Sequence, residues 1–146
     1  MYEIIEYIKE YEKDAKQLII DISVKEYGFK EFEQGFRQSD YEKYKRSGGN
    51  FWLVLNDNKN VIGTMALEKQ DEIGYLSGVY LHNDYRGKGI SQELLELVIE
   101  YAKKNNIKTI TLGTYEKYSR AIKFYEKNNF IRFKEEGNEY YYKLDL

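Results

Sequence analysis

The sequence predicts a mixed α/β fold, with helices on both faces of one sheet. Two observations lead to this prediction: short apolar runs typical of strands, and longer segments whose apolar residues recur at helical spacing. They follow in the order strand, two helices, three strands, helix, strand, helix and two strands, as in a mixed sheet covered on both sides. With 146 residues, 42% of them hydrophobic, the chain can bury its own core. We therefore expect residues 1–146 to form a single domain.

The first third of the chain predicts one strand and two helices. YEIIEYI, at 2–8, alternates enough to form a strand. The segment 14–28 predicts a helix with Asp14 as its N-cap and Gly28 as its stop. A shorter helix is expected within 39–49, which ends in two glycines.

The middle of the chain predicts three strands. The runs at 50–57 and 60–69 are separated by turn-forming residues, which predicts a hairpin. The third run, 73–82, contains two glycines, the second of them Gly78. Because glycine within a strand often marks a bulge, we expect an irregularity there.

The remaining elements are predicted by the same patterns. The segment 91–106 has apolar residues at helical spacing and lysines near its end. A short buried strand at 108–114 and a helix at 119–129 follow, and two strands at 130–136 and 139–146 close the fold.

Composition excludes several classes of function. The net charge is −2, with both signs interspersed, which argues against a nucleic-acid partner. No apolar run approaches the roughly 20 residues of a membrane span, and the first residues lack a signal-peptide core, so we expect a cytoplasmic protein with no membrane partner. Without cysteine and with one histidine, we expect no disulfide, no cysteine nucleophile and no metal.

The stretch NDYRGKGIS, at 83–91, is the strongest candidate for a binding loop. It lacks the full P-loop pattern and only half-matches a dinucleotide fingerprint, because Gln92 stands at the third glycine position. Backbone N–H groups at Gly87 and Gly89, followed by a helix, could instead form an anion site for a pyrophosphate. Arg86 and Lys88 would add positive charge. A plain strand-to-helix turn remains the alternative.

The loop and two further blocks resemble the GNAT superfamily of N-acetyltransferases. RGKGIS is similar to the family's R/Q-x-x-G-x-G/A signature, which binds the pyrophosphate of coenzyme A. LSGVYLHN, at 76–83, resembles the lead-in strand, and RAIKFYEKNNF, at 120–130, resembles the block A-x-x-f-Y-e-k-n-G-F. GGNFWLVL, at 48–55, followed by VIGTMAL, at 61–67, resembles a strand hairpin of the family, so the likeness covers nearly the whole chain. The sequence departs from the family at four positions: Asn83 for Pro, Ser91 for Gly or Ala, Tyr118 for Asn, and Asn129 for Gly.

The resemblance implies the acyl-CoA N-acyltransferase fold, with acetyl-CoA as acetyl donor. The donor's pantetheine arm would lie between the strand at 79–81 and the strand at 109–113, and backbone N–H groups near Tyr80 and Leu81 would polarise the thioester. Tyr125 would be the general acid that protonates the leaving thiolate, unless it is only a packing residue. The residues implied to bind the donor are Val79, Tyr80, Leu81, Arg86, Gly87, Lys88, Gly89, Ile90, Ser91, Tyr118 and Arg120.

The acceptor and the base are less closely defined by the resemblance. Glu72 is our candidate for the base, with His82 as the alternative, each acting through water. Acidic and aromatic residues of the first helices and the last hairpin would receive a cationic amine: Glu26, Tyr27, Phe29, Phe32 and Tyr140 to Tyr142.

The function that the resemblance implies is an N-acetyltransferase. It would move an acetyl group from acetyl-CoA to a primary amine of a small molecule or amino acid-like acceptor, by direct attack, since no cysteine could carry the acyl group. The alternative is a GNAT-fold sensor that binds acyl-CoA without turnover. A protein acceptor and a homodimer both stay open.

Overall fold

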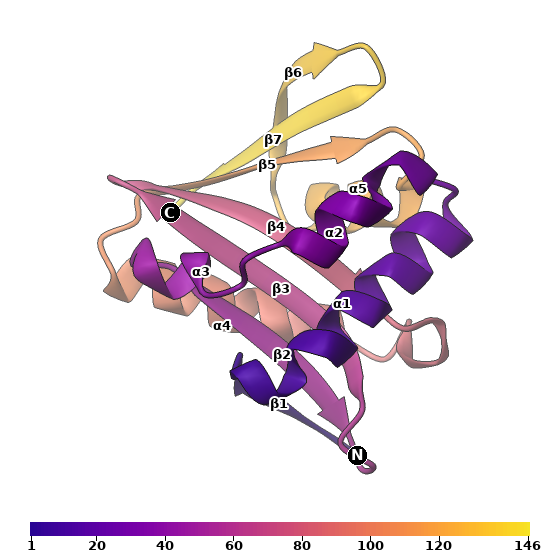
Figure 1. The fold of residues 1–146 in the computed structure, drawn as a ribbon. Helices are drawn as coiled ribbons and strands as arrows, with labels where there is room; N and C mark the ends of the chain where they lie inside the picture. Colours follow the sequence, from indigo (N-terminus) through magenta and orange to yellow (C-terminus); the bar gives the residue numbers. More distant parts are fainter.

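The computed structural model describes residues 1–146 and contains one seven-stranded sheet in the order β1-β2-β3-β4-β5-β7-β6 (Figure 1). Neighbouring strands are antiparallel except β4 and β5, which are parallel, so the predicted mixed sheet is confirmed. The strands are β1 (Tyr2–Glu6), β2 (Asn50–Asn56), β3 (Val61–Gln70), β4 (Ile73–Leu81), β5 (Thr109–Tyr115), β6 (Ile131–Glu136) and β7 (Glu139–Asp145).

Helices cover both faces of this sheet, as predicted. The elements α1 to α3 lie on one face and α4 on the other (Figure 1). The helical elements are η1 (Lys9–Tyr11), α1 (Glu12–Ile20), the π-helical η2 (Asp21–Glu26), η3 (Lys30–Phe32), α2 (Glu33–Gln38), α3 (Lys43–Arg46), η4 (Asn83–Tyr85), α4 (Ile90–Lys104) and α5 (Ser119–Lys127).

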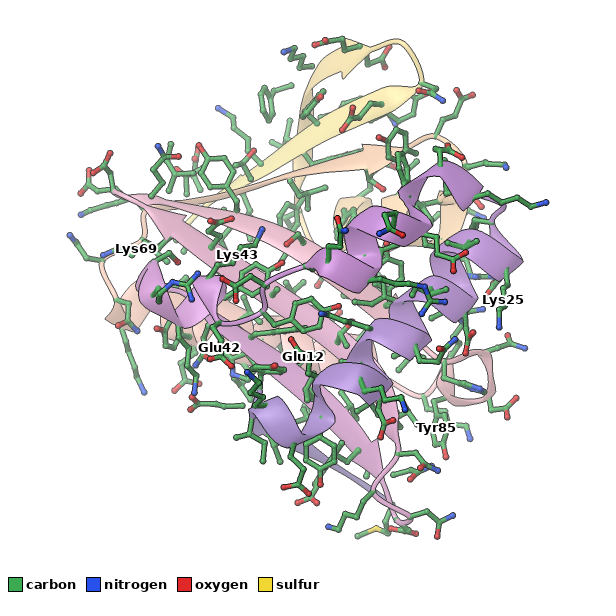
Figure 2. The ribbon with its side chains drawn as sticks, in the orientation of Figure 1. Glu12, Lys25, Glu42, Lys43, Lys69 and Tyr85 are labelled. Atoms are coloured by element: carbon green, nitrogen blue, oxygen red, sulfur yellow. The ribbon has the colours of Figure 1, made fainter.

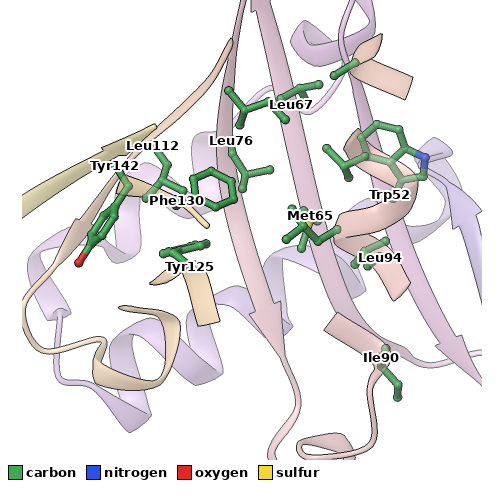
Figure 3. Close-up of a cluster of buried hydrophobic side chains, with 14 of the residues drawn as sticks. Trp52, Met65, Leu67, Leu76, Ile90, Leu94, Leu112, Tyr125, Phe130 and Tyr142 are labelled. Atoms are coloured by element: carbon green, nitrogen blue, oxygen red, sulfur yellow. The ribbon is translucent and has the colours of Figure 1, made fainter. Parts of the chain in front are cut away.

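The strand β2 contributes to the apolar cores on both faces of the sheet, because its side chains alternate between the two faces. Phe51 and Leu53 pack under α1, and Trp52 and Val54 pack toward α4. All four are at most 3% exposed, so the strand shows a continuous apolar run instead of an alternating one. Figure 3 shows the α4-side core, including Trp52, Met65, Leu94 and Tyr125.

The early helices differ from their predicted bounds. Asp14 is not an N-cap: α1 begins at Glu12, and Asp14 lies in its first turn, where a carboxylate also favours the helix dipole. The helical path continues through η2 and ends before Gly28, close to the predicted stop. The short helix α2 was not predicted, because its sequence EQGFRQ holds a glycine and a single apolar residue.

The predicted irregularity in β4 is confirmed. The β3–β4 register shifts between Thr64 and Ala66, opposite Gly78, whose φ is +59°. Parallel pairing of β4 with β5 then stops at Tyr75 and Thr111. Beyond this point the two strands diverge, and α2 lies over the widening gap (Figure 1).

Charged side chains of both signs are interspersed over the helical face. Figure 2 shows Glu12, Lys25, Glu42 and Lys43 spread along the elements between β1 and β2. Several belong to local ion pairs, such as Lys16 with Glu12 at 3.4 Å. None of the helices combines the length and the apolar character that a membrane span requires.

Candidate active site

A cavity of about 900 Å³ opens where β4 and β5 diverge. Its walls come from β4, β5 and α5 in the middle, from the glycine loop and the start of α4 on one side, and from η2, η3 and α2 on another. Fourteen of its 28 lining residues are hydrophobic. Concave, partly apolar surfaces with a few polar groups are the usual form of small-molecule sites.

The glycine loop presents bare backbone to this cavity. Gly87 and Gly89 have φ of +77° and +82°, and a Cβ added at either would meet no atom within 4 Å. Gly89 is the N-cap of α4 and supplies no side-chain cap, so the first N–H groups of a 15-residue helix stay unpaired beside the cavity. The helix dipole adds partial positive charge here, which makes the loop suited to an anion.

Arg86 holds the loop in place. Its Nε donates to the Leu81 carbonyl at 3.0 Å, and its two terminal nitrogens donate to the Glu26 carboxylate at 2.9 and 3.0 Å. Arg120, at the start of α5, donates to the same carboxylate at 2.5 Å. Hydrogen bonds from Arg86 and then Arg120 lower the pKa of Glu26, although its partial burial opposes this shift. Both arginines line the cavity, but their guanidinium groups are already engaged by Glu26.

Most of the predicted donor-binding residues come together at the cavity. Lys88 is the exception, because it is absent from the lining and its ammonium lies 5.7 Å above the ring of Tyr85. The predicted residues that line the cavity are Val79, Tyr80, Leu81, Arg86, Gly87, Gly89, Ile90, Ser91, Tyr118 and Arg120.

Tyr125 belongs to both the core and the cavity. Its ring packs 5.6 Å from that of Phe130 and 6.2 Å from that of Tyr142, and the residue is only 4% exposed (Figure 3). It also lines the cavity, and its hydroxyl makes no hydrogen bond within the chain. Burial, and secondarily Tyr118, raise the pKa of Tyr125 above its ordinary value, so the phenol keeps its proton at neutral pH.

Tyr118 joins the middle of the cavity to the first helices. Its hydroxyl and that of the buried Ser23, in η2, share a hydrogen bond of 2.7 Å. Its ring contacts Tyr27 edge-on, with centroids 4.6 Å apart, and Tyr80 lies 6.4 Å away. Burial raises the pKa of Tyr118 and of Tyr80, so both phenols are neutral hydrogen-bonding groups at this point.

The two candidates for the base lie outside the cavity lining. Glu72 is an exposed residue in the turn before β4, about 20 Å along the strand from the bulge at Gly78, at the rise of about 3.3 Å per residue of a strand. His82 is exposed at the other end of β4, where its Nδ1 accepts from the Asp84 N–H at 3.1 Å. A catalytic role for Glu72 does not fit this position, because the divergence that forms the cavity begins only after Tyr75.

The predicted acceptor residues divide into three groups. Tyr27 and Phe32 line the cavity, and Phe29 lies behind them, 8% exposed and stacked on Phe32 at 5.3 Å. Glu26 is occupied by the two arginines. The tyrosines 140–142 do not reach the cavity, since β7 lies beyond β5 in the sheet.

Sequence reasoning missed several residues of the lining, among them Glu31, Phe36 and Tyr115. Glu31 and Phe36 lie in the segment 30–38, which showed no clear helical pattern, and Tyr115 ends β5 one residue beyond the predicted strand. The parallel pairing of β4 and β5 could have indicated Tyr115, because the ends of neighbouring parallel strands lie at the same edge of a sheet.

A diverging parallel strand pair, a bulge and an uncapped helix behind a glycine loop together define an acyl-CoA N-acyltransferase fold. The model of the acetyltransferase (GNAT) family matches residues 9–130. The chain therefore belongs to this family and carries its acetyl-CoA-dependent acetyltransferase domain.

Curated relatives include two kinds of N-acetyltransferase. The chain is 35% identical over 96 residues to N-acetylaspartate synthetase of Xenopus tropicalis. The aligned region covers 63% of this chain and 35% of that relative. It is 28% identical over 140 residues to N-alpha-acetyltransferase 30 of Schizosaccharomyces pombe, and this alignment covers 92% of the chain and 87% of the relative. The chain thus spans about a third of the length of the first relative and most of the second.

Solved structures show the same fold over the whole chain. An acetyltransferase of the GNAT family from Staphylococcus aureus Mu50 is 29% identical, with a TM-score of 0.91 and coverage of 100% of this chain and 99% of the other. The PaiA N-acetyltransferase of Thermoplasma acidophilum, solved in complex with coenzyme A, is 21% identical, with a TM-score of 0.85. The match covers 100% of this chain and 99% of the other.

Proposed function

We propose that this protein transfers the acetyl group of acetyl-CoA to the primary amine of a small or amino acid-like acceptor. One observation carries the proposal: the cavity connects the glycine loop to the point where β4 and β5 separate. The names of the relatives support N-acetylation as the reaction, and they leave the acceptor open because they include both an amino-acid and a protein N-acetyltransferase.

The donor's two ends match two features of the cavity. A pyrophosphate would accept hydrogen bonds from the free N–H groups at Gly89, Ile90 and Ser91. The pantetheine arm, which carries amides, would use backbone groups of β4 that lose their β5 partner after Tyr75, including those of Val79 and the N–H group of Leu81. N–H groups of this segment would also polarise the thioester carbonyl.

Tyr125 would supply the proton that the reaction needs at sulfur. The amine nitrogen forms a C–N bond with the carbonyl carbon, the C–S bond breaks, and the electron pair of that bond goes to sulfur. The Tyr125 hydroxyl would then donate its proton to the thiolate. The proton that the amine releases would pass through water to the Tyr125 oxygen and restore the phenol. Its neutral state at pH 7 and its lack of a partner in the chain fit this role.

Direct transfer is the expected route, because the sequence contains no cysteine that could carry the acetyl group. Both substrates would then be bound together, with the donor on the loop side and the acceptor on the side of η3 and α2. The cavity has lining residues from both sides, as such a complex requires.

The test is release of free thiol from acetyl-CoA in the presence of a panel of primary amines, including amino acids and short peptides. We expect amine-dependent release that scales with enzyme concentration. Tight binding of acetyl-CoA without turnover on any amine would contradict the proposal and favour a sensor of acyl-CoA instead.

A further inference from the structure

One wall of the cavity, its aromatic end, is lined by aromatic side chains of the segment 27–36 and of the end of β5. This aromatic end consists of Tyr27, Phe32, Phe36 and Tyr115, all half-buried and all in the lining. Phe32 lies between two of the others, with ring centroids 6.3 Å from Phe36 and 5.7 Å from Tyr115. The site therefore offers an apolar surface with flat faces.

Phe29 makes the aromatic end rigid. It is buried and stacks on Phe32 at 5.3 Å, with Tyr115 at 5.1 Å and Tyr118 at 5.3 Å. Because these rings support one another, the surface exists before a ligand arrives, which reduces the entropy lost on binding.

Glu31 is the only carboxylate among the 28 lining residues. It is exposed and forms no salt bridge or side-chain hydrogen bond within the chain. It lies near Tyr115, since it is one of the charges, after burial and Glu139, that raise the pKa of that phenol. An unpaired carboxylate at the rim of an apolar site is suited to a single ammonium group.

The cations near this end of the cavity are already engaged, although the Arg120 guanidinium lies 5.4 Å over the ring of Tyr27 and the Lys117 ammonium 5.3 Å over that of Phe29. Arg86 and Arg120 are bound to Glu26. Lys127 also lines the cavity, but it is the last residue of α5, about 13 Å along the helix axis from Tyr118 at the first end of that helix. Lys117, the nearest lysine outside the lining, donates to the Tyr27 carbonyl at 2.7 Å. The two arginines of the lining are therefore already paired, so neither is free for a carboxylate on the acceptor.

We propose, on the basis of the proposed function, that the acceptor is a primary amine attached to an apolar, aromatic-sized group. The aromatic end takes that group, and Glu31 attracts the ammonium before it loses its proton. The same chemistry occurs in a free arylalkylamine and in a peptide whose first residue is phenylalanine. Acceptors with a second carboxylate, such as aspartate, and acceptors with several ammonium groups, such as spermidine, are poor matches for this site.

The first experiment measures kcat/KM at fixed saturating acetyl-CoA for phenethylamine, a Phe-Gly-Gly peptide, aspartate and spermidine. We expect one of the two aromatic acceptors to exceed both others by at least about tenfold, which corresponds to about 1.4 kcal/mol. The aromatic acceptor with the higher kcat/KM, either the free amine or the peptide, identifies the source of the aromatic group. A preference for aspartate or spermidine would overturn this inference and leave the proposed function intact. Failure of all amines would overturn both.

The second experiment fills the acceptor end. Gly35 lines the cavity from α2, and a Cβ there would meet nothing within 4 Å, so Gly35→Trp has room to project a ring into the site. We expect the KM of the aromatic acceptor to rise at least about tenfold with the affinity for acetyl-CoA unchanged. Gln34→Trp is the matched control, because Gln34 is exposed on the same helix and outside the lining. Equal KM values for both variants would contradict the placement of the acceptor.

The third experiment tests the charge of Glu31 with Glu31→Gln. The variant should lower kcat/KM for the aromatic amine and reduce its dependence on ionic strength, because salt screens the attraction that the wild type alone provides. Glu33→Gln is the control, since Glu33 is already paired with Arg37 at 2.7 Å and does not line the cavity. An unchanged salt dependence in Glu31→Gln would show that Glu31 does not attract the acceptor.

Discussion

Tyr125 packs its ring in the core and also lines the cavity. This double placement separates two roles that a sequence cannot separate, since a tyrosine on an apolar helix face is compatible with packing alone. Burial keeps the phenol neutral by raising its pKa. The substitution that tests the catalytic role must therefore leave the ring in place.

We expect Tyr125→Phe to lower kcat by at least about 100-fold, the usual contribution of a general acid, with little change in the affinity for acetyl-CoA. The ring contacts with Phe130 and Tyr142 survive in this variant, so the fold should persist. Steady-state kinetics and a binding titration measure the two effects separately. An unchanged kcat would remove Tyr125 from the mechanism.

Tyr41 provides a control for losing a buried hydroxyl. It is 4% exposed in the core under α1, and its hydroxyl is buried without a hydrogen-bond partner. Because an unsatisfied buried polar group costs about 1–3 kcal/mol, we expect Tyr41→Phe to raise the free energy of unfolding by about 1 kcal/mol. Turnover should stay at the wild-type value. Denaturant unfolding checks this prediction, and a loss of stability would show that the hydroxyl has a partner.

At the scale of elements, the glycine loop acts as one unit with η2 and α5. Glu26 bridges Arg86 and Arg120, so a π-helical segment far away in sequence fixes the loop that precedes α4. Local motifs predicted the loop itself but not this bridge, because nothing near Glu26 in the sequence indicates its two partners. Arg86, which we expected to add positive charge for a phosphate, also anchors the loop through Glu26.

We expect Gly89→Asp to weaken acetyl-CoA binding at least about 100-fold, since it places a carboxylate at the anion site and a side chain at a positive φ. Gly137→Asp is the matched control. Its φ is +63°, it has equally open space, and it lies in the β6–β7 turn outside the cavity lining. Both variants carry similar backbone strain. Equal affinities, measured by calorimetry on folded protein, would mean that the loop is only a turn.

Elements with a clear apolar pattern or a turn signal at their ends were predictable, and η3 and α2, which have neither, were not. The sheet strands and α4 follow from apolar periodicity, and the bulge follows from Gly78. Asn129 adopts φ of +70°, which Asn tolerates, in place of the family's glycine. The segment 30–38 is fixed by packing of Phe32 against Phe29 and against Tyr115. The contact with Tyr115 joins distant parts of the chain, and no local pattern encodes it.

At the scale of the whole molecule, buried tyrosines should set the alkaline limit of stability. The chain has 16 tyrosines, and burial raises the pKa of several of them, including Tyr7 to about 12. Folded phenols then hold their protons above pH 10, where the unfolded chain loses them, so the unfolded state binds fewer protons. The free energy of unfolding should therefore be constant up to about pH 10 and fall between about pH 10 and 12. Thermal melts across this range check it, and a constant melting temperature up to pH 12 would contradict it.

The whole fold serves to hold β4 and β5 together at one end and apart at the other. The bulge, the glycine loop, the helices α4 and α5 and the first helices all meet at the opening that results. A sequence can indicate each part, but the cavity exists only because strands from different parts of the chain pair for three residues and then separate.

The most direct test of this account is a calorimetric titration of the folded protein with acetyl-CoA, with dephospho-CoA and ATP as comparison ligands. We expect saturable binding of acetyl-CoA at one site per chain and much weaker binding of ATP, which lacks the pantetheine arm that the separated strands would hold. Absence of acetyl-CoA binding, or equal binding of ATP, would contradict the assignment of the cavity as the donor site.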